Sequence, residues 1–243
     1  MRAPIHTAIA TILFGATTIA ATYGAALTTI GDVEAVQQSA YGTPPNAAKA
    51  VKRAGDGVAY QELLETLQKS GMLVKFSDGS KLTLGANSKV LVDEFVYEPG
   101  NAQSKALISL PTGALRYVTG AMPKGQTTID TPTATMVLRG TNVKVVSGPK
   151  GITHLVVDEG SVTVHSKITG QDTLVEEGDS VDISNTGITP SDEDEAGDPL
   201  VDDGFIRKTD TTTPEQRRSG TQHNAHSTNK EPSHKSGGGS TPG

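Results

Sequence analysis

The sequence predicts an all-β protein, built as an irregular sandwich or a short β-roll of stacked hairpins. Three observations predict this fold class. Short runs of alternating apolar and polar residues fill the middle of the chain, turn-forming Gly, Pro, Asp and Asn separate them, and the turn glycines recur at unequal intervals. Alternation is typical of strands with one buried face, and unequal intervals argue against a solenoid or propeller of fixed period.

The composition bounds the remaining possibilities. A chain of 243 residues with 35% hydrophobic residues can form one sizeable core and still leave a tail. The net charge of -6 and the low aromatic content of 4% offer no basic surface, so we expect no nucleic-acid binding. The absence of Cys excludes disulfides, thiol catalysis and thiolate metal sites.

The N-terminus predicts export. Arg2 precedes an uncharged run from Ala3 to Ile30, and Thr22 and Gly24 form a small-x-small pair before position 25. We therefore expect residues 1–24 to be a helical signal peptide, with a periplasmic or extracellular mature protein. The run is also long enough to span a membrane, so an uncleaved anchor that leaves the protein facing the periplasm is the alternative. A helix buried in the core is a third interpretation.

The first segment of the domain is ambiguous. Residues 59–71, "AYQELLETLQKSG", place Leu63, Leu64 and Leu67 at helical spacing with Gly71 as a stop, whereas "ELLETL" can also form a strand. The next segment, "MLVKFSDGSKLTL" at 72–84, predicts a hairpin with its register. A three-residue loop at 77–79 opposes Val74 to Leu82 and Met72 to Leu84, with Gly79 in the left-handed conformation.

Phe95 and Tyr97 share one face of the segment "DEFVYEPG". Such a row either packs in the core or forms a carbohydrate-stacking strip, and we favour the core.

One strand changes its inside face in the middle. In "TPTATMVLRGTNVKVVSG", residues Ala134, Met136 and Leu138 form one apolar row, but beyond Gly140 the apolar positions are odd-numbered. Because side chains alternate across a strand, the change requires an extra residue or a bend, which glycine permits. Arg139 lies at this corner, and we expect its guanidinium to clamp free carbonyls or a carboxylate at the edge of the core.

A loop at 158–160 in "LVVDEGSVTVH" predicts a second hairpin that pairs Val156 with Val162. Gly113 and Gly178 follow sequences similar to the one that precedes Gly160. His154 and His165 fall on or near the strands of this hairpin, without a nucleophile elbow or metal-ligand spacing. We interpret them as cross-strand surface residues.

Neighbouring acidic pairs do not suggest catalysis. Asp93 and Glu94 would point to opposite faces of a strand, and the pairs at 158–159 and 176–177 lie in predicted turns. We predict no enzymatic activity, no catalytic residues, no cofactor and no metal site.

The order of these segments resembles the FecR domain, a β-rich module of exported bacterial proteins. The resemblance covers about residues 31–185 and includes the Asp-Gly-Ser turn, the Thr-Pro that precedes the strand and the Arg-Gly-Thr that follows it. These residues, with one later turn glycine, form the structural signature of the domain: Asp78, Gly79, Ser80, Thr131, Pro132, Arg139, Gly140, Thr141 and Gly160.

The resemblance implies a function in the bacterial envelope. Family members that regulate iron-transport genes combine a cytoplasmic segment that binds a sigma factor, one membrane helix and a periplasmic portion that receives a receptor signal. Only Met1 and Arg2 precede the apolar run here, so we expect a stand-alone, non-enzymatic FecR-domain protein that binds an envelope protein or glycan. The alternatives are a component of cell-surface signalling linked to sigma-factor regulation and, second, an envelope hydrolase.

Residues 190–243 predict a disordered tail, acidic at first and then rich in Ser, Gly and His. Too few apolar residues remain there to offset the entropy of ordering the chain. We interpret His223, His226 and His234 as solvated residues and not as a metal site.

Overall fold

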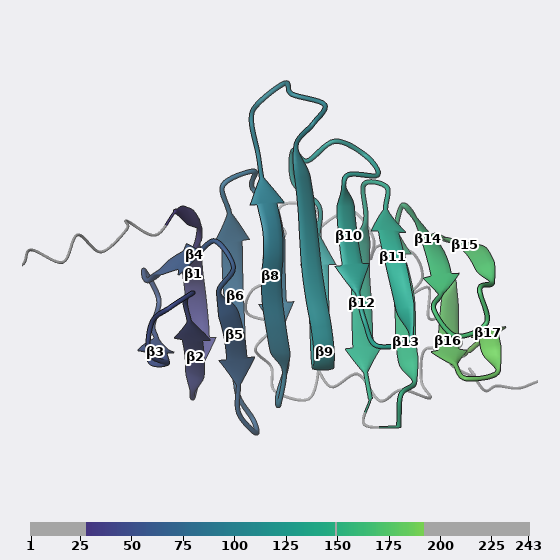
Figure 1. Ribbon diagram of the computed structural model, residues 1–243, viewed down its shortest axis with the longest axis horizontal. Coiled ribbons are helices and arrows are strands. Elements are labelled where there is room, and N and C mark those ends of the chain that lie inside the picture. The colour runs from purple at the N-terminus through teal and green to yellow at the C-terminus, as the bar shows by residue number, and fades with distance from the viewer. Residues whose placement is uncertain (1–27, 149, 192–243) are drawn as a thin grey trace, which may run out of the picture.

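The computed structural model describes residues 28–148 and 150–191 as an all-β domain of 17 strands (Figure 1). This confirms the predicted fold class. The predicted signal peptide at 1–24 and most of the predicted tail lie outside the described residues. Between Thr28 and Ser191, no helix is long and apolar enough to cross a membrane.

The strands form two sheets, which share the long strand β9 (Lys105–Val118). Sheet A has the order β4 (Gly57–Ala59), β1 (Thr29–Gln37), β6 (Gly71–Phe76), β7 (Lys81–Leu84), the second half of β9, β12 (Asn142–Ser147), β13 (Thr153–Glu159), β16 (Ser180–Ser184) and β17 (Gly187–Pro190).

Sheet B has the order β3 (Ala50–Lys52), β2 (Ala40–Thr43), β5 (Leu63–Thr66), β8 (Lys89–Val96), the first half of β9, β10 (Thr127–Asp130), β11 (Ala134–Leu138), β14 (Ser161–Ser166) and β15 (Asp172–Glu176). All described pairings are antiparallel except that of β9 with β10. One hydrophobic core contains residues of both sheets, so the sheets are the two layers of a sandwich.

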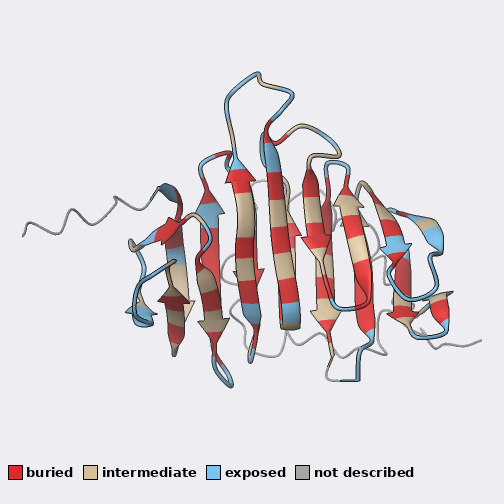
Figure 2. Ribbon diagram, viewed as in Figure 1, coloured by how far each residue is buried: buried red, intermediate tan, exposed pale blue. Residues whose placement is uncertain are grey.

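Buried and less buried residues alternate along the strands, as Figure 2 shows. The change of parity at Arg-Gly-Thr is a crossing between the layers. Ala134, Met136 and Leu138 of β11 face the core from sheet B, whereas Val143 and Val145 of β12 face it from sheet A. The predicted bend is confirmed, because Gly140 has a φ of 68°.

The same change of parity accompanies two further crossings, each at a glycine with positive φ. Within β9, Ile108 faces the core from sheet B and Leu115 from sheet A, with Gly113 between them. Between β13 and β14, Gly160 turns the chain from sheet A back to sheet B. At these three crossings, a change in the parity of the apolar positions therefore accompanies the change of layer.

The second predicted hairpin is wrong. Val156 on β13 pairs with Lys144 and Ser180 in sheet A, whereas Val162 on β14 pairs with Leu138 and Val175 in sheet B. The physical reason is the crossing at position 160, which separates two strands that look like the arms of a tight hairpin in the sequence. For the same reason, the two histidines do not share a hairpin.

The ambiguous segment at 59–71 contains the strand β5 and no helix. Leu64 and Thr66 are buried at a spacing of two residues, while Leu67 is 47% exposed. Gln61 and Lys69 adopt left-handed backbone angles, with φ of 58° and 57°, on either side of the strand. These two residues prevent a continuous helix, so the strand interpretation is confirmed and the helix interpretation is wrong.

The β6–β7 hairpin has the predicted register. Met72 lies opposite Leu84 and Val74 opposite Leu82. The backbone N–H of Phe76 donates to the carbonyl oxygen of Ser80 at 2.9 Å, which closes a three-residue loop, and Gly79 has a φ of 82°. The hairpin prediction is therefore confirmed in both its loop length and its glycine.

Candidate binding site

The Asp-Gly-Ser loop contains a buried carboxylate. Asp78 is 5% exposed, and its Oδ1 accepts hydrogen bonds from the backbone N–H and the hydroxyl of Ser80. Its Oδ2 accepts a hydrogen bond from the backbone N–H of Met122 at 3.2 Å. The carboxylate therefore joins the β6–β7 loop to the segment that follows β9, and Ser80 is needed to satisfy it.

Tyr117 completes this network from β9. Its hydroxyl donates to Ser80 Oγ at 3.0 Å, and its side chain is fully buried. Burial raises the pKa of Tyr117 to about 12, and the nearby Asp78 carboxylate acts in the same direction. Sequence reasoning missed Tyr117, although its odd position after Gly113 is the signal that places it inside sheet A.

The segment 119–122 connects this loop to the Arg-Gly-Thr corner. A Cβ on Gly120 would lie 2.3 Å from the backbone nitrogen of Ser80, so only glycine permits this approach. The backbone N–H of Thr119 donates to the carbonyl oxygen of Thr141 at 2.9 Å, and the N–H of Thr141 donates to Thr119 Oγ1 at 3.1 Å. The two motifs are therefore held together through one segment.

The predicted clamp by Arg139 is wrong. The Arg139 side chain is exposed and makes no hydrogen bond or ion pair with residues 28–148 or 150–191, and only its backbone N–H is engaged, by Ser161 O at 3.0 Å. The chain leaves sheet B at this point, so the Arg139 side chain points away from the core. The prediction considered only the alternation of side chains within one strand and therefore missed this orientation. The hydrogen bonds between the backbone of Thr141 and Thr119 hold the corner instead.

Thr131 and Pro132 lie at the opposite end of β11, away from the other signature residues. Thr131 Oγ1 accepts hydrogen bonds from the backbone N–H of Ala134 at 3.1 Å and from the hydroxyl of Thr153 at 2.9 Å. Thr153 begins β13, so this buried pair of threonines joins a turn of sheet B to sheet A. Pro132 is exposed.

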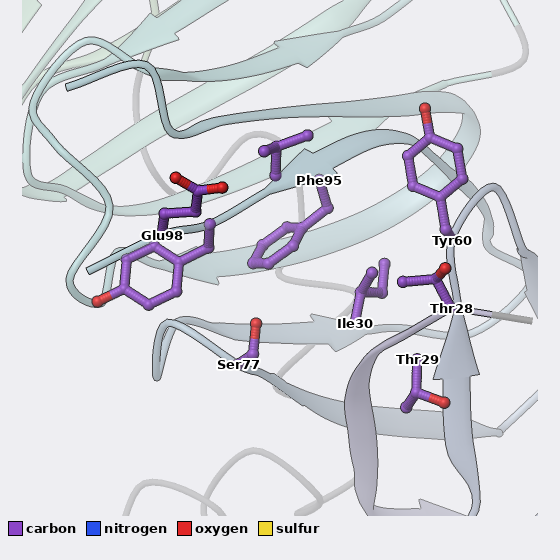
Figure 3. Close-up of a pocket in the computed structure, with 9 residues that line it drawn as sticks. Thr28, Thr29, Ile30, Tyr60, Ser77, Phe95 and Glu98 are labelled. Atoms are coloured by element: carbon purple, nitrogen blue, oxygen red, sulfur yellow. The ribbon is translucent and has the colours of Figure 1, made fainter. Parts of the chain in front are cut away.

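A pocket of about 420 Å³ lies beside the Asp-Gly-Ser loop (Figure 3). Its lining comes from the start of β1, the residue after β4, the β6–β7 loop and the end of β8: Thr28, Thr29, Ile30, Tyr60, Ser77, Phe95, Val96, Tyr97 and Glu98. Backbone hydrogen bonds fix this arrangement, because Tyr60 N–H donates to Thr28 O at 2.8 Å and Ser77 N–H to Ile30 O at 2.9 Å.

The predicted aromatic row forms part of this pocket. Phe95 is 5% exposed and stacks on Phe76 with ring centroids 4.8 Å apart, so its predicted core role is confirmed. Tyr97 is half-buried and packs against the core from the edge. Glu98 accepts a hydrogen bond from Asn101 Nδ2 at 2.8 Å. The pocket thus has an apolar floor with hydroxyls and one carboxylate at its rim, which suits a side chain or a small ligand.

The two histidines each pair with one aspartate. His154 Nδ1 lies 2.8 Å from Asp182 Oδ1, and His165 Nδ1 lies 2.7 Å from Asp172 Oδ1. His154 is buried and His165 is exposed, so the surface interpretation holds only for His165. In the described ranges, no group of three or more His, Asp or Glu side chains is arranged to hold a metal ion.

The described domain is a two-layer β sandwich, in which the Arg-Gly-Thr motif forms one crossing between the layers and the Asp-Gly-Ser motif closes a hairpin loop of sheet A. Residues 62–163 match the family described as FecR protein, and all nine signature residues fall in this range. This match confirms, over residues 62–163, the resemblance to the FecR domain that the sequence predicted.

No curated protein matches the chain. Two crystal structures of a candidate anti-sigma factor from Parabacteroides distasonis ATCC 8503, at 2.50 and 1.65 Å resolution, each align with 17% sequence identity and TM-scores of 0.45 and 0.44. Each alignment covers 54% of this chain and 60% of the solved chain, so the match spans less than two thirds of the length of those proteins.

Proposed function

We propose that this protein is a non-enzymatic component of cell-surface signalling, in which the FecR domain binds another protein. The observation that carries the proposal is the FecR match over residues 62–163. FecR-domain regulators of the kind that the sequence resembles pass a signal from the envelope to a sigma factor. The alternative function is binding of an envelope structural protein or glycan without a role in signalling. The experiment below distinguishes this alternative from the signalling function.

The site where we expect the partner to bind is the pocket beside the Asp-Gly-Ser loop. Its volume of about 420 Å³ suits an apolar side chain of a partner protein. Val96 stands at its edge with 43% of its surface exposed, where a docked chain would cover it. The buried Asp78 network next to the pocket keeps Ser77 in place, so the pocket is largely formed before a partner arrives.

The expected location follows from the N-terminal apolar run. An exported or membrane-anchored chain would present the FecR domain to the periplasm, where it could receive a signal from another envelope protein. Two of the buried or half-buried Asp side chains serve the folded structure. Asp78 closes a turn, and Asp182 pairs with His154.

The experiment compares two single substitutions in the native host. Val96→Glu introduces a charge at the pocket, and Val51→Glu is the matched control, because Val51 is 48% exposed on the edge strand β3 and does not line the pocket. Transcripts are measured in a deletion strain complemented with the wild-type or variant gene. We expect deletion and Val96→Glu to change one group of genes under a single sigma factor, and Val51→Glu to leave that group unchanged.

Cross-linking of intact envelopes followed by mass spectrometry gives the second readout. Wild type and the Val51→Glu variant should recover one partner protein that the Val96→Glu variant loses. If deletion changes no coherent group of transcripts while cross-linking recovers a surface protein or glycan, the signalling function is wrong and the protein is a structural module of the envelope.

A further inference from the structure

The described sandwich has four edge strands, which are β3 and β15 in sheet B and β4 and β17 in sheet A. An edge strand carries unpaired backbone N–H and C=O groups, so an extended segment of another protein can add to it as a further strand. Among the described strands, β15 pairs only with β14, and it lies at one end of sheet B (Figure 1). With five residues, β15 is the longest of the four edges.

Each of the other three edges has a feature that limits strand addition. The strands β3 and β4 are only three residues long. The strand β17 contains Pro190, and its Ile188 N–H already donates to Gln171 Oε1 at 3.0 Å. Short length, proline and an occupied backbone donor are common ways to protect the edge of a sheet. The β15 sequence, "DTLVE", has none of these features.

The hydrogen bonds of β14 show which of its residues bond to β15. Arg139 N–H donates to Ser161 O at 3.0 Å, and Lys167 N–H donates to Thr133 O at 2.9 Å, at the two ends of the β11–β14 pair. The odd-numbered residues of β14 therefore direct their backbone groups towards β11. Because backbone groups alternate in direction along an antiparallel strand, the even-numbered residues direct theirs towards β15.

The register then gives the orientation of β15 itself. Thr173 and Val175 lie opposite even-numbered residues of β14, so their backbone groups are used within the sheet. Asp172, Leu174 and Glu176 consequently turn their backbone N–H and C=O groups away from β14. Within the described ranges, no hydrogen bond from a turn or loop reaches the backbone of Leu174. This edge is therefore open to a further strand.

The same three residues present an acidic–apolar–acidic pattern on the outer face of sheet B. Val175 belongs to the core, so its neighbours on the strand face outward. Leu174 is 55% exposed, and Asp172 and Glu176 are exposed as well. The sequence from 168 to 191 contains no Lys or Arg, and Glu177 adds a further acidic residue directly after the strand. The open edge is therefore negatively charged around one exposed leucine.

These charges decide which kind of strand the edge can accept. If two copies of β15 paired in antiparallel fashion about Leu174, Asp172 of each copy would lie opposite Glu176 of the other. Like charges directly opposite each other destabilise a strand pair, so the edge disfavours a second copy of the same chain. A segment with cations at both of these positions would instead form two favourable cross-strand pairs.

We propose that β15 is a docking edge, at which an extended basic segment of a partner protein adds a strand to sheet B. The segment carries Lys or Arg two residues before and two residues after an apolar residue. Its cations lie opposite Asp172 and Glu176, and its apolar side chain lies beside Leu174.

This edge is distinct from the pocket at the end of β8. Five strand spacings separate β8 from β15 in sheet B, or about 24 Å at about 4.8 Å each. The inference is therefore independent of the proposed signalling function, and either can fail while the other stands.

The test uses a short peptide as the probe, acetyl-Thr-Lys-Thr-Val-Thr-Lys-Thr-amide, which has the same pattern in both chain directions. It is titrated into the ¹⁵N-labelled full chain at low salt, and the backbone amide shifts are followed by NMR. We expect saturable shifts at Asp172, Leu174 and Glu176. A matched peptide with Glu in place of both Lys residues should bind about ten-fold more weakly or less, because its charges repel the edge.

Two pairs of variants separate strand addition from attraction by charge alone. Leu174→Pro removes the outward N–H but no bond to β14, so the edge strand tolerates it and should lose binding of the Lys peptide. Leu174→Thr keeps the N–H and should retain binding. Glu176→Lys should weaken binding about ten-fold. Asp32→Lys, which makes the same charge change at an exposed position of β1, should leave it unchanged.

Three results would overturn the proposal. The first is the absence of saturable shifts at β15, and the second is equal binding of the Lys and Glu peptides. The third is full binding by the Leu174→Pro variant, which would mean that the peptide is held by charge and not as a strand. Sedimentation of the full chain without peptide gives an independent check, since a dimer that Leu174→Pro abolishes would identify a second copy as the occupant and exclude the basic segment.

Discussion

Gly140 and Gly160 stand at two separate crossings between the layers, and their backbones are in contact. A Cβ added at Gly160 would lie 2.2 Å from the carbonyl oxygen of Gly140. Both residues have left-handed backbone angles, with φ of 68° and 83°. The crossing after β11 and the crossing after β13 therefore pack on each other. Glycine is required at position 160 because the backbone has a positive φ and because a Cβ would clash with Gly140.

Gly160→Ala should destabilise the domain more than Gly178→Ala. Both positions have positive φ, so each substitution incurs about 1 kcal/mol of backbone strain. Only Gly160 would also clash, since an added Cβ at Gly178 meets nothing within 4 Å. Overpacking adds about 1–3 kcal/mol to the loss in unfolding free energy. Chemical denaturation measures both variants, and equal losses would show that the crossing can relax.

Arg139→Met should change the unfolding free energy by no more than about 0.5 kcal/mol, as is usual for exposed positions. Thr119→Val should instead lower it by about 1–3 kcal/mol, because it removes the acceptor of the Thr141 N–H and leaves a polar group unpaired. Urea denaturation of both variants checks this. A large loss in the arginine variant alone would restore the clamp that the sequence suggested.

Tyr117→Phe should lower the unfolding free energy by about 1 kcal/mol at neutral pH, through loss of the hydrogen bond to Ser80. Its pKa is raised from 10.0 to about 12, so unfolding allows ionisation in this window. The stability that depends on the neutral phenol is complete below pH 10 and is lost as the pH rises towards 12. The difference between wild type and variant should therefore shrink above pH 10. A constant difference up to pH 12 would contradict the assignment.

Glu65→Gln should destabilise the domain at neutral pH but not in acid. A hydrogen bond from Lys49 is the main cause that lowers the pKa of Glu65 below its ordinary value of 4.5, and Lys89 acts in the same direction. A carboxyl whose pKa is lowered in the folded state stabilises the protein at pH values above its ordinary pKa. This stabilisation is lost as the pH falls through the lowered pKa of the folded state. Thermal melts from pH 7 to pH 2.5 should show the two proteins converging, and a pH-independent gap would exclude the ionic contribution.

Lys52→Met should be among the most damaging single substitutions. Lys52 Nζ lies 2.7 Å from Glu62 Oε1, and the Glu62 side chain is fully buried. Removal of the cation leaves a buried carboxylate without its partner, which costs about 3–5 kcal/mol. Lys49→Met is the control, because Lys49 is 45% exposed and should cost about 1 kcal/mol or less. Equal effects would mean that water reaches the Lys52–Glu62 pair.

The sequence predicted the features that depend on neighbouring residues. Loop length, register and the glycine of the β6–β7 hairpin follow from local alternation and turn chemistry, and the structure confirms them. The bend at Gly140 was predicted for the same reason, since a change of parity is visible in the sequence. The buried Lys52–Glu62 pair was not predicted, because the two residues meet only when β2 and its neighbours assemble around Gly42.

The sequence by itself determined the all-β class, the bend at Gly140 and the FecR resemblance, because alternation and glycine placement act over a few residues. Only the tertiary structure decided which sheet each strand joined. Val156 and Val162 look like a hairpin pair in the sequence, yet crossing at Gly160 places them in opposite layers. The sheet that a strand joins depends on the total apolar area that each whole sheet buries against the other. Strands far apart in the sequence contribute to this area, so no local sequence pattern predicts it.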